Sequence, residues 1–290
     1  MKSVSLFSFN NIYILLSLAM ISWAIAWTNA KIVGEYLSFY NLIFFRFLLG
    51  FISLLPFLIY NKKKLPHLKS YKFIVIPSIL FFIYNIAFFK GTYFGDAGRG
   101  AILVTTLNPL FTLLIISSIR KKILFKEVLG IIIVLFGGLI IMDVFKTGFD
   151  IIFDIKNIYF LICAITWGVM TVFIDIAQKK INPYVFISLC YFFTMAISLF
   201  FTDFTLIDFS VLDFRFYFNF FLVSIGAMSF GTSVYMYSTS IIGPVKASVF
   251  IFSVPFLAMG TSYVFLNEIF SLNTMIGGLI SLIAIYIVNK

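Results

Sequence analysis

The sequence is poor in charge: only 11% of its 290 residues are Asp, Glu, Lys or Arg, whereas 62% are hydrophobic and the mean hydropathy is +1.11. A soluble domain carries about 25% charged residues. A soluble chain of this length could not cover its surface with so few charges. The composition therefore excludes a water-soluble globular protein and makes the lipid bilayer the solvent for most of the chain.

Cysteine and histidine are almost absent, which limits the chemistry that the chain can perform. Cys163 and Cys190 both lie inside apolar runs, so we expect two buried thiols rather than a disulfide. The single histidine, His67, lies in a lysine-rich stretch outside these runs. The chain thus offers no histidine and cysteine cluster for a metal, and no Ser–His or Cys–His pair inside the membrane. We expect no metal, no cofactor and no enzymatic activity.

What the chain has in abundance is apolar runs, and ten of them are long enough to cross a bilayer as helices. A transmembrane helix needs about 20 residues to span a hydrocarbon core about 30 Å thick. Helices are expected because lipid offers no partners for open backbone groups. The sequence therefore predicts an all-α polytopic membrane protein. The predicted spans are residues 11–30, 37–60, 71–92, 97–118, 125–143, 157–178, 184–202, 216–240, 244–266 and 272–289.

Basic residues are sorted by side of the predicted membrane. Of the 21 lysines and arginines, Arg46 and Lys90 lie inside spans. Five more lie on the side of the loop between the first and second spans: Lys31, Arg99, Lys146, Lys156 and Arg215. The other 14 of the 21 lie on the side of the N-terminus. The positive-inside rule then puts both termini in the cytoplasm. This sorting accounts for the net charge of +10 without a nucleic-acid partner.

The chain also resembles itself in two halves of five spans each. Trp23 and Trp167 have similar neighbours, Ser-Trp-Ala and Thr-Trp-Gly, and Pro109 in the fourth span matches Pro255 in the ninth. An odd number of crossings per repeat gives the halves opposite orientations. Inverted repeats are typical of secondary transporters, whose substrate site lies near the midplane. The predicted inverted five-helix repeats are residues 1–146 and 147–290.

Two basic residues inside spans are candidates for contact with a substrate. A charge in mid-membrane is costly and therefore needs a reason. Arg46, near mid-depth, either binds an anion or caps backbone carbonyls of a neighbouring helix. Lys90, near the end of the third span, either contacts substrate or extends to the interface. No Asp or Glu lies at the middle of a span, where proton relays usually have carboxylates. The pattern argues against obligate proton coupling and favours facilitated diffusion or exchange.

The fourth span contains the densest polar motif, Thr105-Thr106-Leu107-Asn108-Pro109. Proline frees backbone carbonyls in mid-membrane, which is tolerated where they line a cavity. Thr105 and Asn108 fall on one helical face and are predicted to line the site. Phe252, beside Pro255, is the candidate in the corresponding helix of the second half. The alternative is a kink that only helps packing.

Aromatic and polar side chains at similar depth complete the predicted site. Tryptophan in membrane proteins usually lies at the interface, whereas Trp23 and Trp167 lie at the middle of the first and sixth spans. They either stack on a substrate or fill the core. Hydroxyl and amide groups within spans either bridge helices or bind ligand. The candidates of this second kind are Tyr84, Asn85, Ser229 and Tyr235.

In order and spacing, these residues resemble the drug/metabolite transporter superfamily, EamA type. The resemblance covers the whole chain and rests on the ten spans and on Trp23, Trp167, Arg46, Asn108-Pro109, Val254-Pro255 and Glu268 before Gly277-Gly278. It implies alternating access around a central cavity built by spans one, three, four, six, eight and nine. It also implies transport of small metabolites such as amino acids, often outward. One position departs from it: Glu268 lies about nine residues before Gly277, whereas the equivalent place before Gly130 in the first half is Arg120-Lys121-Lys122, with no acid.

We therefore expect a multi-pass protein of a bacterial inner (plasma) membrane that moves a small polar or anionic solute as an exporter or exchanger. Multidrug efflux of lipophilic compounds is the alternative, although it usually uses an intramembrane carboxylate. Gly137-Gly138 and Gly277-Gly278 predict close helix contact. These spans pack against each other or against a second copy, so the chain is expected to be a monomer or a homodimer.

Overall fold

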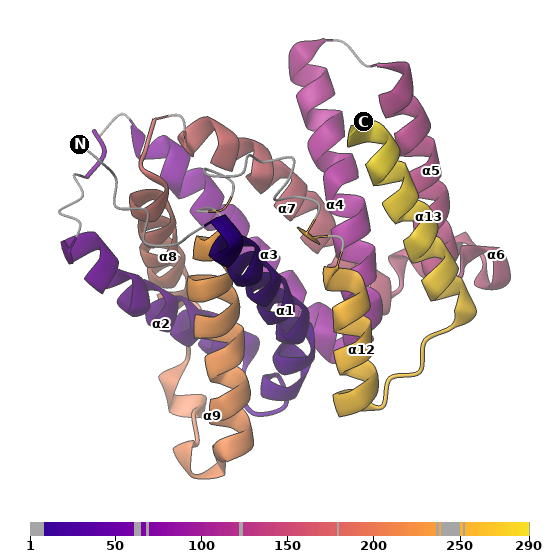
Figure 1. Cartoon of the computed structure of the whole chain (residues 1–290). Coiled ribbons are helices and arrows are strands. Elements are labelled where there is room, and N and C mark those ends of the chain that lie inside the picture. Colours follow the sequence, from indigo (N-terminus) through magenta and orange to yellow (C-terminus); the bar gives the residue numbers. More distant parts are fainter. Residues whose placement is uncertain are drawn as a thin grey trace.

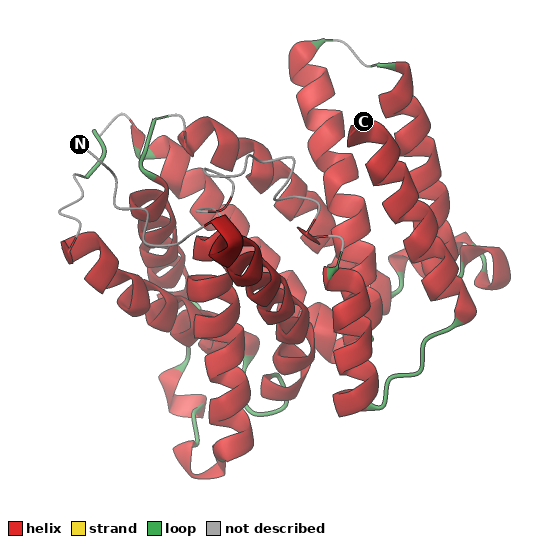
Figure 2. Cartoon of the chain, in the orientation of Figure 1, coloured by secondary structure: helices red, strands yellow, loops and turns green. Residues whose placement is uncertain are grey.

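The computed structural model describes residues 9–60, 65–67, 70–121, 124–178, 180–235, 238, 250–251 and 253–289. Within these residues every regular element is a helix and none is a strand (Figure 2). The all-α prediction is confirmed for this part of the chain. The α12–α13 linker lies at the lower end of the bundle in Figure 1, whereas the α4–α5 connection and the C-terminus lie at the upper end. We call the lower end the linker end.

Within the described residues, long helices follow one another along the chain, with short helical turns between some of them. The elements are α1 (Phe9–Val33), α2 (Phe39–Tyr60), α3 (Lys72–Phe94), α4 (Ala97–Arg120), α5 (Phe125–Ile141), α6 (Val144–Thr147), η2 (Phe149–Phe153), α7 (Ile155–Gln178), α8 (Pro183–Leu199), η3 (Phe204–Leu206), η4 (Phe209–Val211), α9 (Phe214–Phe221), η5 (Leu222–Thr232), α12 (Val254–Leu266) and α13 (Leu272–Asn289). The helix α9 continues into η5 without a break and forms one apolar stretch, Phe214–Tyr235.

Length and apolar composition make six of these helices able to cross a membrane: α1, α2, α3, α4, α7 and the joined α9 and η5. The helices α8, α12 and α13 are apolar but shorter. Each of these nine helices overlaps one of the spans predicted from the sequence. The ninth predicted span, 244–266, is described only in part, and α12 begins at Val254. The chain has the architecture of a polytopic membrane protein.

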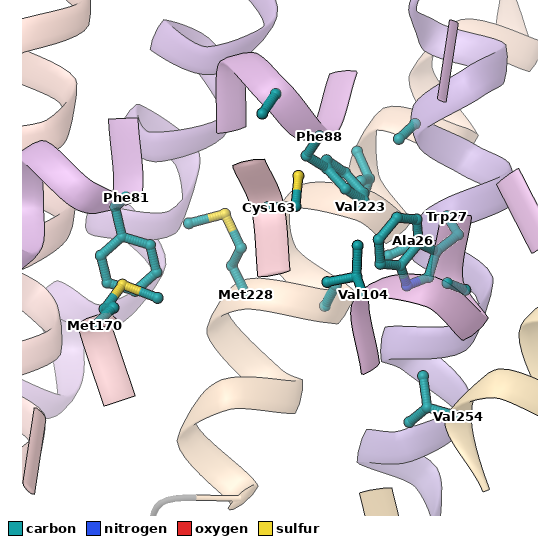
Figure 3. Packing of buried hydrophobic residues seen from close by; sticks show 14 of the residues in the cluster. Ala26, Trp27, Phe81, Phe88, Val104, Cys163, Met170, Val223, Met228 and Val254 are labelled. Carbon is teal, nitrogen blue, oxygen red and sulfur yellow. The ribbon is translucent and has the colours of Figure 1, made fainter. Parts of the chain in front are cut away.

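The most extensive helix contacts join the first half of the chain to the second. The pairs are α5 with α13, α3 with α7, α4 with α7, α2 with α8, α1 with η5, α1 with α12, and α4 with α12. Apolar side chains from these helices form one continuous core. Figure 3 shows members of that core from α1, α3, α4, α7, η5 and α12 pointing into the same interior. Neither half could bury its apolar helix faces without the other.

Glycine at the turn between α3 and α4 allows α7 to lie directly against it. A Cβ on Gly100 would lie 2.2 Å from the Phe160 ring, and one on Gly91 would lie 2.7 Å from it. Phe160 itself is fully buried. The glycine-rich segment is therefore explained by close packing against an aromatic ring.

The glycines of α5 and α13 meet each other within one chain. A Cβ on Gly277 would lie 2.5 Å from the carbonyl oxygen of Gly137, and a Cβ on Gly137 would lie 2.2 Å from the Ser281 hydroxyl. Of the two arrangements predicted for these glycine pairs, the structure shows the contact between the two halves of one chain. The two cysteines, Cys163 and Cys190, are buried free thiols, as predicted.

A repeated sequence shapes the connection between α8 and α9. Asp203-Phe204-Thr205 is followed five residues later by Asp208-Phe209-Ser210. Each aspartate accepts hydrogen bonds from the hydroxyl and backbone N–H two residues on, at 2.6 and 2.9 Å in both repeats, and so caps η3 or η4. These bonds hold the pKa of both carboxyls below the ordinary value. Such side-chain caps are the usual reason that Asp and Ser begin short helical turns.

Candidate functional site

The two predicted tryptophans lie against each other in the interior of the bundle. Trp23 of α1 and Trp167 of α7 meet edge to face, with ring centroids 6.4 Å apart. Tyr235 lies 5.2 Å from Trp23, whereas Tyr84 and Phe81 of α3 lie 5.0 and 6.3 Å from Trp167. Edge-to-face and tilted pairs at these distances are favourable arrangements of aromatic rings. We call these five side chains the aromatic cluster.

The segment η5, beside the aromatic cluster, is a π-helix eleven residues long. Short π-helical stretches occur often at functional sites, because the wider turn changes how backbone groups are paired. Three side chains from other helices donate hydrogen bonds to carbonyl oxygens of η5: Trp23 Nε1 to Ala227 (2.9 Å), Arg46 Nε to Val223 (3.1 Å) and Tyr191 OH to Met228 (3.2 Å). The irregular backbone is thus held by α1, α2 and α8.

Glycine lets η5 approach α1 closely. A Cβ on Gly231 would lie 2.7 Å from Trp23 Nε1, and one on Gly226 would lie 3.2 Å from the Ser22 hydroxyl. The same close approach allows the indole N–H of Trp23 to reach the Ala227 carbonyl. The position of the Trp23 ring is therefore set by the backbone of η5.

Arg46 is buried, with only 6% of its surface exposed, and is held by neutral groups. Its guanidinium donates to the Asn85 side-chain oxygen at 2.5 Å, and its carbon lies 5.2 and 5.5 Å from the ring centroids of Phe88 and Phe89. The Asn85 amide donates in turn to the Phe81 carbonyl at 2.8 Å. Among the described residues no carboxylate forms a salt bridge with Arg46. Arg46 is connected to the aromatic cluster through its partner Asn85, which directly follows Tyr84 in the sequence.

Ser229, Thr105 and Asn108 also lie in the bundle, with different neighbours. The Ser229 hydroxyl is 2.6 Å from that of Ser53, which joins η5 to α2. Thr105 donates to a carbonyl of its own helix. The Asn108 carbonyl lies where α4 meets α7, since a Cβ on Gly168 would be 3.0 Å from it. The half-buried Asn108 amide has no hydrogen-bond partner among the described residues.

Of the other predicted site residues, Lys90 has no described contact with this group. Lys90 lies near the end of α3, with its ammonium 5.7 Å from the Tyr159 ring centroid of α7. No contact described for Lys90 reaches the aromatic cluster. Phe252 lies outside the described residues. The structure thus brings together Trp23, Tyr84, Trp167 and Tyr235, and it places Arg46 and Asn85 beside them.

Several residues of this region were not among the predicted site residues. Phe81 and Phe88 precede and follow Tyr84 by about one helical turn, so a helical-face analysis of α3 would have found them. Ser53 lies seven residues after Arg46, again on the same face of its helix. Tyr191 matches Phe47 only through the internal repeat, and its bond to η5 has no sequence signal.

Comparison with known proteins agrees with this architecture. The model of the EamA-like transporter family matches the chain twice, over residues 10–143 and 155–290. The chain belongs to the EamA-like transporter family. It is also 29% identical over 142 residues to a Bacillus subtilis (strain 168) protein named "Uncharacterized transporter YoaV", a match that spans 47% of this chain and 48% of that protein. The EamA chain therefore aligns with about half the length of this relative.

The fold is found among solved structures as well. A crystal structure described only as that of a protein superposes with a TM-score of 0.63 at 16% identity, over 97% of this chain and 96% of that one. At this identity the similarity concerns the fold alone. Membership of this family places the EamA chain in the drug/metabolite transporter superfamily, which points to a transporter rather than an enzyme.

Proposed function

We propose that this EamA protein carries a small polar or anionic metabolite, such as an amino acid, across the plasma membrane of a bacterium as an exporter or exchanger. Ten helices cross the bilayer in two inverted halves, residues 1–146 and 147–290. Both termini lie in the cytoplasm, as the distribution of lysine and arginine favours. The halves alternate between two arrangements that open the site to one side and then the other.

The pattern of helix contacts supports the inverted halves. If α1–α5 are matched in order with α7, α8, the joined α9 and η5, α12 and α13, then contacts occur in exchanged pairs. The contact of α3 with α7 corresponds to that of η5 with α1, and α4 with α7 corresponds to α12 with α1. A two-fold relation between halves produces such exchanges, and the double match of the family model agrees with it.

The observation that carries the proposed site is the meeting of Trp23 and Trp167. One tryptophan comes from the first helix of each half, so the pair lies where the halves join. Substrate sites of inverted-repeat transporters lie at such a junction. Beside it, Arg46 supplies a positive charge without a paired carboxylate among the described residues. Aromatic faces together with positive potential favour a solute that carries a carboxylate and some apolar surface.

Uptake into sealed proteoliposomes tests the proposal. Purified protein is offered a mixed metabolite pool, with and without an imposed pH gradient, and the lumen is analysed by mass spectrometry. Accumulation of an anion or amino acid that ignores the gradient is the expected result. Accumulation of lipophilic compounds alone would instead support multidrug efflux, and gradient-dependent flux would contradict the uncoupled mechanism.

Two variants then test the site. Trp167→Ala and Asn108→Leu should each reduce transport at least about tenfold while the protein remains folded, because both alter the region where the halves meet. Phe200→Ala is the matched control, since that ring follows the last residue of α8, is 87% exposed and has no described contact with the cluster. Normal transport by both site variants would remove this assignment.

A further inference from the structure

A second polar cluster, at the linker end, joins parts of the chain that alternating access must separate. Glu268 lies in the linker between α12 and α13 and is 8% exposed. Its Oε1 accepts from Lys31 Nζ at 2.8 Å and from the backbone N–H of Ala97 at 2.9 Å, and its Oε2 accepts from the N–H of Gly98 at 3.0 Å. Lys31 also donates to the Gly95 carbonyl at 3.0 Å. One carboxylate thus connects α1, the α3–α4 turn and α4.

This carboxylate takes the place of a missing local cap. A helix N-terminus has unpaired N–H groups and a partial positive charge. The α4 helix, 24 residues long, begins after Asp96, whose side chain makes no capping bond. Glu268 reaches those N–H groups from 170 residues further along the chain. Charge-assisted bonds of this kind are stronger than neutral ones, but they hold only while the linker stays in place.

An aromatic ring of the same linker covers the same turn. A Cβ on Gly98 would lie 2.6 Å from the Phe270 ring and 3.2 Å from the Met259 backbone. One turn deeper, the buried Thr28 hydroxyl lies 3.1 Å from that of Thr261 and 3.2 Å from that of Ser262, which joins α1 to α12. The linker end is therefore closed in successive layers: the charged group, the ring and the hydroxyl contacts.

We propose that Lys31, Glu268 and the first turn of α4 form a latch that holds this mouth of the transporter closed and releases when the mouth opens. The inference rests on the proposed function, since only an alternating transporter needs such a release. The latch joins α1, α4 and the linker that follows α12. These three helices contain Trp23, Pro109 and Pro255, respectively. Opening requires Glu268 to leave the α4 N–H groups, and both the carboxylate and the Lys31 ammonium then return to water.

The sequence supports the same idea at the opposite end. Trp23 and Trp167 are 144 residues apart, and the same spacing relates Lys31 to position 175. Glu268 lies nine residues before Gly277, and position 121 lies nine residues before Gly130. These residues are Asp175 and Lys121. Each half therefore has one acidic and one basic residue at the two positions, with the signs exchanged.

Labelling of a buried thiol measures the latch directly. Thr28→Cys is introduced in full-length protein in which Cys163 and Cys190 are replaced by alanine, and the protein is reconstituted in liposomes. The rate of reaction with a membrane-impermeant maleimide is then compared with and without Glu268→Gln or Lys31→Met. Each latch variant should raise the rate about tenfold by shifting the population toward the open mouth.

Two controls define the result. Asp213→Asn removes an exposed acid that caps α9 and should leave the rate unchanged. Ser271→Cys, in the exposed linker, should react at the same rate in every variant. Unchanged labelling at position 28 in both latch variants would overturn the proposal, as would failure of both to fold, which would make the contact a structural cap. The labelling needs no solute, so faster labelling without uptake of any offered metabolite would reject the proposed class of solute and keep the latch.

Discussion

Arg46 and Lys31 are two cations withdrawn from water in opposite ways. Arg46 is 6% exposed and is held by the Asn85 side chain, a carbonyl of η5 and two phenylalanine rings. The Lys31 side chain is 25% exposed and pairs with the Glu268 carboxylate at 2.8 Å. Arg46 has neutral partners on two packed helices, α3 and η5, whereas Lys31 has a charged partner in a linker.

The difference between them is one of reversibility. Carbonyl oxygens, an amide and ring faces in a packed core cannot leave Arg46 without unpacking α2, α3 and η5. An ion pair near the end of the bundle can separate because water then solvates both charges. We therefore assign Arg46 to a fixed part of the site, where it orders η5 and sets the local potential, and Lys31 to a moving part. The following predictions test this comparison.

Replacing Arg46 should have the largest effect on stability. Arg46→Met leaves the Asn85 oxygen and the Val223 carbonyl without their donor, and each buried unsatisfied group costs about 1–3 kcal/mol. The midpoint of unfolding in an SDS titration, followed by circular dichroism, should fall clearly below that of the unaltered protein. Arg46→Lys should be intermediate, because it keeps the charge but loses the planar donors. An unchanged midpoint for Arg46→Met would show that Arg46 is not fixed.

The next largest loss of stability is expected from adding a methyl group against the Phe270 ring. Gly98→Ala puts a methyl group where the ring and the Met259 backbone leave no room, and overpacking costs about 1–3 kcal/mol. The same SDS titration measures it. Gly260→Ala on α12 is the matched control, since nothing lies within 4 Å of its added Cβ. Equal behaviour of the two variants would mean that the linker closes loosely over α4.

The Lys31–Glu268 pair should show a smaller, coupled effect. In a double-mutant cycle of Lys31→Met and Glu268→Gln, we expect a coupling of about 0.5–1 kcal/mol, the scale found for polar pairs in membrane proteins. Exchanging the two charges, Lys31→Glu with Glu268→Lys, should not restore stability, because a cation would then face the positive end of α4. Full rescue by the exchange would show that the helix N-terminus takes no part.

The smallest effect is expected for a charge that is fully in water. Hydrogen bonds from the Ser210 hydroxyl and N–H lower the pKa of Asp208. A folded-state pKa below the unfolded value stabilises the protein above the unfolded pKa, and this contribution is lost as pH falls through the folded value. Asp208→Asn should therefore shift the unfolding midpoint slightly at neutral pH and not at all in acid. A shift that persists in acid would contradict the capping role.

Much of the fold follows from local sequence. Apolar runs predict where the helices lie, because a helix in lipid must be apolar along its whole length. The repeat of Trp23 in Trp167 predicted two residues that meet in the structure. The glycine pairs predicted close helix contact but left the partner open, since the same small surface serves a second copy as well as α5 and α13.

The pairing of polar groups could not be read in the same way. From the sequence, Arg46 could either bind an anion or cap backbone carbonyls of a neighbouring helix. In the structure its described hydrogen-bond partners are the Asn85 side chain and a carbonyl of η5. Glu268 was noted only for its spacing to Gly277, because nothing local connects it to α4. Lys90, like Arg46, was predicted as a basic residue within a span that could contact substrate, yet its described ring contact is Tyr159, which is not part of the aromatic cluster.

The sequence by itself determined the solvent of this protein, its helical class and the family to which it belongs. These properties depend on composition, run length and order along the chain. The tertiary structure alone decided which side chains meet, which glycines face a ring and which carboxylate caps α4. The reason is that such contacts join residues far apart in the chain: Arg46 and Asn85 are 39 positions apart, and Lys31 and Glu268 are 237 positions apart. Their geometry exists only once the two halves of the chain have packed against each other.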